Sequence, residues 1–154
     1  MTDITITIEP PDQPDVIALL EASDVYTASL YDADSIFMLD LDELRDPKVT
    51  FLVARLSGRI SGCVALVQKP GDWGEIKRMF VDETARGYSL GNKLLATLED
   101  HARAAGMKLV RLETGIHQPE ALSLYRKAGY GEISAFGEYL PDPVCVFMEK
   151  RLTD

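Results

Sequence analysis

Two apolar runs rich in β-branched residues, 49–56 and 60–68, are separated only by Ser57-Gly58-Arg59. A connection this short can join only antiparallel neighbours, so the two runs predict a β-hairpin. A second turn over residues 70–72 leads into a further strand over 73–81. The middle of the chain therefore predicts three consecutive antiparallel strands, and the remaining segments must pack against the apolar sides of these strands.

The segments before and after these strands alternate between helical and strand patterns. Asp12 is placed to cap a helix with Pro14 in its first turn, and a short helix over 41–44 follows. The clearest helix carries a stripe of leucine and alanine from Leu90 and ends at Gly106. The remaining expected elements are strands over 4–8, 108–113, 130–135 and 144–150 and a helix from Pro119 to Gly129. Residues 22–40 favour no particular element.

The order is strand, two helices, three antiparallel strands, helix, strand, helix and two strands. It predicts an α/β fold, with a mixed, mostly antiparallel sheet and helices on both faces. The chain has 154 residues and shows no internal repeat or linker, so we expect one domain over residues 1–154.

The negative charge is concentrated at the start of the chain. Of the formal net charge of −9, residues 1–50 hold twelve acidic and two basic side chains, whereas the rest of the chain is nearly balanced. This distribution argues against binding to a nucleic acid, which requires a basic surface. A small cationic partner near the N-terminal third is compatible with it, and so is an acidic surface that only maintains solubility.

Neither a membrane span nor a targeting segment is expected. The longest apolar run, 63–67, is far shorter than the roughly 20 residues of a transmembrane helix, and the N-terminus does not resemble a signal peptide. Cys63 and Cys145 lie among apolar neighbours without the spacing of metal ligands, so we expect reduced core thiols and no metal. These features favour a cytoplasmic protein.

Residues 81–94 lead from a strand into the leucine-striped helix and predict an anion-binding loop. Gly87 and Gly91 allow a ligand to approach the backbone, and the first amides of the helix have no partners within it. Arg86 and Lys93 add positive charge. The segment lacks the ending of a P-loop and the glycine pattern of a dinucleotide-binding loop, so an ordinary glycine turn remains the alternative.

Three stretches resemble the GNAT superfamily of acyl-CoA-dependent N-acyltransferases. Residues 75–81 (EIKRMFV) are similar to the fourth strand of that family, and residues 86–91 (RGYSLG) resemble its pyrophosphate loop. Residues 118–125 (QPEALSLY), followed by Gly129-Tyr130, are similar to its motif Asn-x-x-Ala-x-x-Leu-Tyr-x-x-x-Gly-Phe. The order of elements agrees over nearly the whole chain. Ser89 and Gln118 depart from the frequent glycine and asparagine, and Ser89 must avoid a positive φ or accept its cost.

The resemblance implies the GNAT-like fold and acetyl-CoA as the cosubstrate. The acyl-CoA would lie in a V between the strand that ends at Val81 and the strand over 108–113. Backbone groups of the first strand would pair with pantetheine, and amides of the loop would hold the pyrophosphate. The expected acetyl-CoA-binding residues are Met79, Phe80, Val81, Arg86, Gly87, Tyr88, Ser89, Leu90, Gly91, Asn92 and Gln118.

Tyr125 and Glu75 are the expected catalytic residues. A leaving thiolate needs a proton, which the phenol of Tyr125 could give, and an ammonium acceptor needs a base, which Glu75 could be. The alternatives are a core aromatic for Tyr125 and a strand-end salt bridge for Glu75, which along a regular strand shares a face with Lys77 and Met79. Weaker candidates are Glu113, His117 and Glu138.

The acceptor side in this family is framed by the first two helices and by the last loop between strands, here residues 22–46 and 136–142. The candidate acceptor-binding residues are Tyr26, Tyr31, Phe37 and Tyr139. Because the first segment is acidic and aromatic, we expect a cationic primary amine as acceptor. An acyl-CoA-binding sensor with little turnover is the competing function. A tRNA-acetylating toxin is disfavoured by the acidic charge, and a homodimer is plausible only by analogy.

Overall fold

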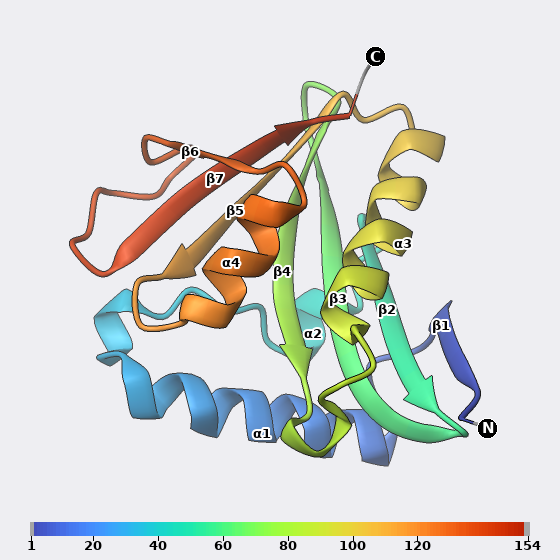
Figure 1. The fold of residues 1–154 in the computed structure, drawn as a ribbon. Coiled ribbons are helices and arrows are strands. Elements are labelled where there is room, and N and C mark those ends of the chain that lie inside the picture. Colours follow the sequence, from blue (N-terminus) through green and yellow to red (C-terminus); the bar gives the residue numbers. More distant parts are fainter. Residues whose placement is uncertain (1, 153–154) are drawn as a thin grey trace.

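The protein is described by a computed structural model that covers residues 2–152, and it forms one seven-stranded sheet (Figure 1). The strands are arranged in the order β1-β2-β3-β4-β5-β7-β6. Their bounds are β1 Ile4–Ile8, β2 Val49–Leu56, β3 Arg59–Lys69, β4 Trp73–Val81, β5 Leu109–Gly115, β6 Gly131–Ile133 and β7 Cys145–Arg151. Every pairing is antiparallel except β4 with β5, which confirms the predicted mixed, mostly antiparallel sheet.

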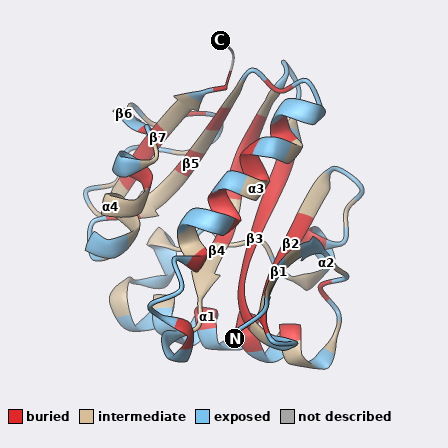
Figure 2. Ribbon diagram, turned by 45° about the vertical axis from the view of Figure 1, so that its right-hand side comes forward, coloured by how far each residue is buried: buried red, intermediate tan, exposed pale blue. Residues whose placement is uncertain are grey.

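Helices cover both faces of the sheet, as the sequence predicts. Helices α1 (Pro14–Leu30) and α2 (Leu41–Leu44) pack on one face through a cluster that includes Val16, Leu20 and Leu44. Helices α3 (Leu90–Ala104) and α4 (Pro119–Lys127) pack on the other. Figure 2 shows that the buried residues follow the central strands and the inner side of α3. Each fully buried leucine of α3 contributes about 1.5–3 kcal/mol.

The first helix differs from its expected form at both ends. Its N-cap is Gln13 rather than Asp12, with Pro14 in the first turn. At the other end it continues to Leu30, through residues that showed no clear pattern. A 3₁₀ turn, η1 (Ala33–Ser35), follows it, and another, η2 (Glu83–Ala85), precedes α3. Within the described residues, no helix combines the length and apolar character needed to cross a membrane.

A bulge interrupts β4 and changes which of its side chains share a face. Cys63 pairs with Phe80 and Ala65 with Lys77, so two residues of β4 lie opposite the single residue between Cys63 and Ala65. Within the bulge Arg78 adopts a positive φ of 58°. Met79 consequently packs with the cluster beneath α3 and α4, not on the side of Glu75 and Lys77. The expectation that Glu75 and Met79 share a face was wrong, because a regular alternation does not survive an inserted residue.

A buried carboxylate joins α3 to the last strand. Glu99 is 5% exposed, and its two oxygens accept hydrogen bonds from the Tyr130 hydroxyl at 2.9 Å and from Lys150 Nζ at 2.8 Å. We expect Glu99→Ala to lower the free energy of unfolding by about 3 kcal/mol, because it leaves a buried hydroxyl and an ammonium without their acceptor. Urea unfolding measures the change.

The neighbouring Asp100 provides the control for that prediction. Its side chain is 79% exposed and lies 3.6 Å from the Arg103 guanidinium. Asp100→Ala should change the unfolding free energy by less than about 0.5 kcal/mol. Equal effects of the two substitutions would show that the Glu99 contacts contribute nothing specific.

Candidate active site

Strands β4 and β5 separate partway along their length. Their pairing runs from Trp73 with Leu109 to Ile76 with Leu112 and ends there, while β5 continues beside β7 to Gly115. The edge of β4 beyond Ile76 therefore faces a gap instead of a strand, which is the V that the resemblance implied. An unpaired strand edge of this kind can take an extended ligand as an additional strand.

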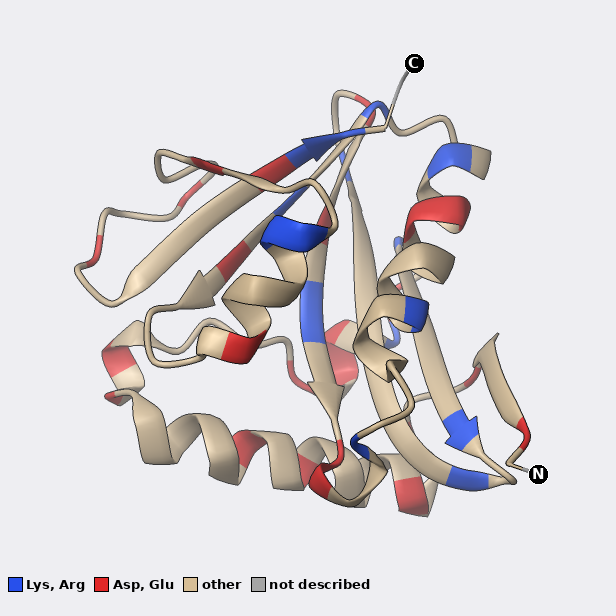
Figure 3. Ribbon diagram, in the orientation of Figure 1, with Lys and Arg blue, Asp and Glu red and all other residues tan. Residues whose placement is uncertain are grey.

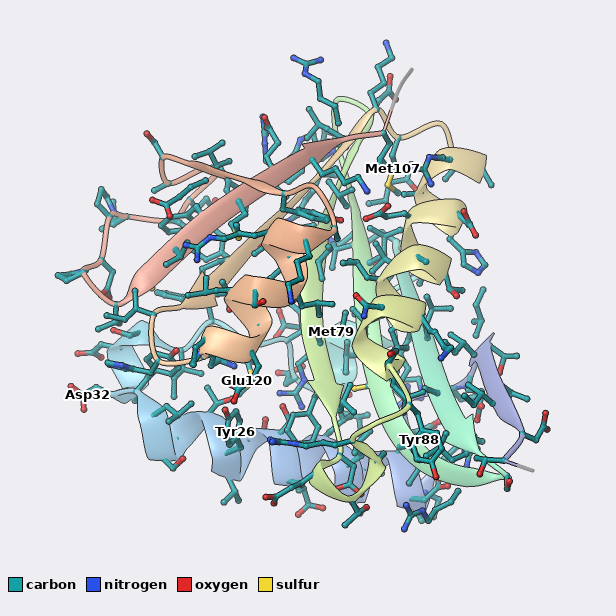
Figure 4. The ribbon with its side chains drawn as sticks, in the orientation of Figure 1. Tyr26, Asp32, Met79, Tyr88, Met107 and Glu120 are labelled. Carbon is teal, nitrogen blue, oxygen red and sulfur yellow. The ribbon has the colours of Figure 1, made fainter. Side chains whose placement is uncertain are left out.

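A cavity of about 110 Å³ opens at this separation, between α1, α4 and the segment after η1. Its lining mixes hydroxyl, apolar and charged side chains. The charged members are Lys77, Arg78 and Glu113. Of the residues expected in the site, Tyr31, Phe37, Met79, Gln118 and Tyr125 also line it. Figure 4 places Met79 on the part of β4 that α3 and α4 flank.

Tyr125 projects from α4 into the cavity wall and is 4% exposed. Its ring meets the ring of Tyr130 edge-on, with 5.7 Å between centroids. Burial, and secondarily the charge of Glu113, raises the pKa of the Tyr125 hydroxyl. The phenol therefore keeps its proton at neutral pH and can act as a donor toward the cavity.

Glu113 also lines the cavity, near the end of β5. Burial raises the pKa of its carboxyl from 4.5 to about 7, against the opposing charge of Lys77. The Cys145 thiol, itself half-buried rather than in the core as expected, also opposes the rise in the pKa of this carboxyl. A carboxylate whose pKa lies near neutrality can accept a proton and release it at working pH. In the sequence, the only indication of a role for Glu113 was an acidic side chain at the end of an expected strand.

Glu75 lies outside the cavity lining and is 3% exposed. It accepts a hydrogen bond of 2.6 Å from the Tyr139 hydroxyl, and its carboxylate is 3.3 Å from Lys77 Nζ. Lys77 also donates to the Tyr139 hydroxyl and, at 2.7 Å, to the Phe37 carbonyl. Lys77 thus joins the Phe37 segment to the Tyr139 loop, and Glu75 pairs with both Lys77 and Tyr139, so the salt-bridge alternative describes its observed contacts.

Phe37 and Tyr139 come from those two loops, and their rings meet edge-on with 5.3 Å between centroids. Tyr31 stands at the end of α1, where its hydroxyl donates to Gln118 Oε1 and accepts from the His117 amide, each at 3.1 Å. A Cβ at Gly115 would overlap the Tyr31 ring, so this contact requires glycine. Tyr26 lies outside the lining and packs toward Phe80 near the end of β4 (Figure 4).

The loop before α3 presents a run of unpaired amides. Lys93 is the first residue of α3 whose amide donates to a backbone carbonyl, that of Ser89. Among the residues that the structure describes, the amides of Leu90, Gly91 and Asn92 find no acceptor. Gly87 has a φ of 94°, and Ser89 adopts a φ of 55°. Of the two alternatives for Ser89, the structure therefore has the positive φ, with the backbone strain that it brings to a non-glycine residue. Figure 4 shows Tyr88 in this loop, below α3.

The loop has the features of an anion-binding helix start, and its pyrophosphate role stays a prediction of the resemblance. Several amides and the positive end of the α3 dipole converge on one exposed loop, with the exposed Arg86 among its residues. A Cβ at Gly91 would come within 3.1 Å of the Leu124 side chain, so the small residue also allows α3 and α4 to meet closely. Phe80 and Val81 end β4 immediately before this loop.

The acidic residues of 22–46 lie elsewhere. Within the described residues, none of them lines the 110 Å³ cavity, although Asp24 and Asp40 border a second hollow of about 290 Å³ that shares Met38 and Arg78 with it. Figure 3 shows the acidic positions along α1 and around α2. The charge argument for a cationic acceptor therefore remains a prediction. No group of three potential metal ligands occurs in the described part of the chain.

Comparison with known proteins adds independent information. Residues 15–130 match the acetyltransferase (GNAT) family. The chain is 48% identical over 153 residues to an IAA acetyltransferase of Azospirillum brasilense, covering 99% of this chain and 100% of that protein. A Klebsiella pneumoniae protein assigned as an acyl-CoA N-acyltransferase is 42% identical, with a TM-score of 0.86 over 97% of this chain and 98% of the other. The Salmonella typhimurium protein yncA, solved with its cofactor acetyl-CoA, shares the fold at 21% identity (TM-score 0.72 over 99% and 95% of the two chains).

Proposed function

Because this chain belongs to the acetyltransferase (GNAT) family, we propose that it transfers the acetyl group of acetyl-CoA directly to a primary amine bound in the cavity between β4 and β5. The chain is an acyltransferase by membership of that family. The observation that most supports the proposal is the separation of β4 from β5 beyond Ile76, beside a loop of unpaired amides.

The geometry supports the acetyl-CoA-binding residues that the resemblance implied. The edge of β4 from Met79 to Val81 would pair with the pantetheine, and the amides from Arg86 to Asn92 would hold the pyrophosphate. When bound, acetyl-CoA supplies an acetyl thioester, whose carbonyl carbon is the electrophile. Gln118 would contribute its amide nitrogen, because its oxygen already accepts from Tyr31.

Two residues of the chain would move protons. Glu113 on β5 would take one proton of the acceptor ammonium, and the freed amine would form the new C–N bond at the thioester carbonyl carbon. As the C–S bond breaks, Tyr125 on α4 would give its proton to the sulfur and recover a proton from the nitrogen, which becomes the amide. Both line the cavity, and the pKa of about 7 for Glu113 suits a base at neutral pH. We assign the base to Glu113 rather than to Glu75, because Glu75 faces Tyr139 and Lys77 instead of the cavity.

Turnover separates this proposal from an acyl-CoA sensor. The purified protein is mixed with acetyl-CoA and a panel of primary amines, and released thiol is measured together with calorimetric binding of coenzyme A. We expect amine-dependent thiol release. If coenzyme A binds but no amine causes thiol release, the protein is an acyl-CoA sensor. If coenzyme A does not bind and no thiol is released, the proposed acyl-CoA site is wrong.

Arg86→Ala tests the pyrophosphate loop. Loss of one charge-assisted contact should raise the KM for acetyl-CoA about tenfold while the KM for the amine stays unchanged. The matched control is Lys108→Ala, which removes an exposed cation immediately before β5, at the other end of that strand from the cavity. Steady-state kinetics with each substrate varied in turn measures both constants, and equal effects of the two variants would contradict the assignment.

A further inference from the structure

Arg78 is a buried cation whose hydrogen-bonding capacity is only partly used. Its side chain is 4% exposed, and the residue lines the cavity. One terminal nitrogen contacts Asp24 at 2.5 Å and Met38 Sδ at 2.8 Å, and the other donates to the Leu20 carbonyl at 3.3 Å. Within the described residues, Arg78 Nε is the buried side-chain nitrogen or oxygen that lacks any partner. Such an orphaned donor calls for a ligand or another explanation.

The bulge in β4 is what brings this guanidinium to the cavity. On a regular strand, Arg78 and Lys77 would point to opposite faces. The inserted residue and the positive φ of Arg78 place both cations in the lining, on the side of α1. A non-glycine residue in this conformation is strained by about 1–2 kcal/mol, which the surrounding contacts must offset.

The two cations are not equivalent as binding groups. The Lys77 ammonium donates hydrogen bonds to the Phe37 carbonyl and the Tyr139 hydroxyl, and its charge is balanced by the Glu75 carboxylate at 3.3 Å. Over the described residues 2–152, Arg78 retains the unused Nε–H, and the one carboxylate that pairs with it, that of Asp24, is 54% exposed. Arg78 is therefore the lining cation that can receive an anionic group.

We propose that the acceptor is a zwitterion of the α-amino acid class, whose carboxylate binds Arg78 while its amino group meets Glu113. The inference rests on the proposed function and names the substrate class of that same site. The lining contains one residue suited to each charge: Arg78 on β4 for the carboxylate and Glu113 on β5 for the ammonium. Arginine suits this task because its planar fork can hold a carboxylate through two parallel hydrogen bonds.

The first test compares acceptors that differ only in the carboxylate. Each amino acid of a panel is assayed beside its α-amide and its decarboxylated amine, with acetyl-CoA in excess and thiol release as the readout. We expect kcat/KM for the best amino acid to exceed that of its two partners at least tenfold. An equal or higher kcat/KM for the uncharged partners would overturn the inference and leave the acetyltransferase function intact.

Substitution of Arg78 then locates the effect. Arg78→Gln should raise the KM for the amino acid about 10–100-fold, change the KM for the decarboxylated amine less than threefold and leave the KM for acetyl-CoA unchanged. Arg55→Gln is the control, because Arg55 is also a partly buried arginine paired with carboxylates, those of Glu9 and Asp15, but lies outside the cavity. Equal losses for both acceptors in Arg78→Gln would contradict a role in carboxylate binding.

Two further measurements keep the test decisive. If Arg78→Gln does not fold, Arg78→Lys replaces it: this variant keeps the positive charge without the planar guanidinium and should still raise the KM for the amino acid severalfold. Asp24→Asn removes the carboxylate that competes for Arg78 and should lower the KM for the amino acid. Calorimetry of the amino acid with coenzyme A-bound enzyme requires no turnover. Arg78-dependent binding without thiol release would refute the proposed function alone, and binding unaffected by Arg78 would refute this inference.

Discussion

Replacing Glu113 with glutamine should lower kcat/KM for the amine by about 10²–10⁴-fold at pH 7, because the acceptor ammonium loses the group that takes its proton. The side chain keeps its size, so binding of acetyl-CoA should not change. In the wild-type enzyme, kcat/KM should fall tenfold per pH unit below about 7, where the raised pKa of Glu113 leaves the carboxyl protonated. In Glu113→Gln, this acidic limb of the pH profile, the fall of kcat/KM below pH 7, should disappear.

The pH profile also distinguishes loss of a base from general damage. As the pH approaches about 10, where a primary amine deprotonates by itself, the deficit of Glu113→Gln should shrink. Glu75→Gln serves as the comparison: it disturbs the contacts to Tyr139 and Lys77, and it should lower activity without removing the limb near pH 7. If kcat/KM of Glu113→Gln still falls below pH 7 as in the wild type, the base is a group other than Glu113.

The same substitution has a signature in stability. The folded pKa of Glu113, about 7, exceeds the ordinary value of 4.5, so the folded state holds this proton more tightly than the unfolded state. The resulting stability is fully present below about pH 4.5 and is lost as the pH rises through 7. Glu113→Gln avoids this loss. Relative to wild type, it should gain on the order of 2 kcal/mol between pH 5 and pH 8, measured by urea unfolding.

Tyr125→Phe should lower kcat by about 10²-fold or more, with little change in either KM. The hydroxyl borders the cavity, and burial raises its pKa, so its proton is present when the sulfur departs. Phenylalanine preserves the ring and its edge contact with Tyr130. Single-turnover thiol release measures the chemical step apart from binding.

Tyr130→Phe is the matched control for that experiment. It removes a neighbouring hydroxyl of the same kind, which donates to Glu99 instead of facing the cavity. We expect this variant to be less stable and to keep its kcat. An unchanged kcat in Tyr125→Phe would make Tyr125 a core aromatic, and a comparable fall in both variants would indicate disturbed packing of α4.

The catalytic assignments show where sequence reasoning reached its limit. The motif around Tyr125 pointed to a residue that the structure does place in the cavity wall. The choice of Glu75 followed from its place in a strand motif, yet its carboxylate faces Tyr139 and Lys77. Glu113 was a weaker candidate, because a single acidic residue at a strand end gives no sign of its burial.

The sequence by itself determined the order of elements, the mixed sheet with helices on both faces and the glycine-containing loop that leads into α3. These features follow from local periodicity, turn residues and the unpaired amides of any helix start, which act over a few residues. Only the tertiary structure decided which side chains meet in the cavity. The separation of β4 from β5 and the bulge at Arg78 set those positions, because both depend on the register between strands that are distant in the chain.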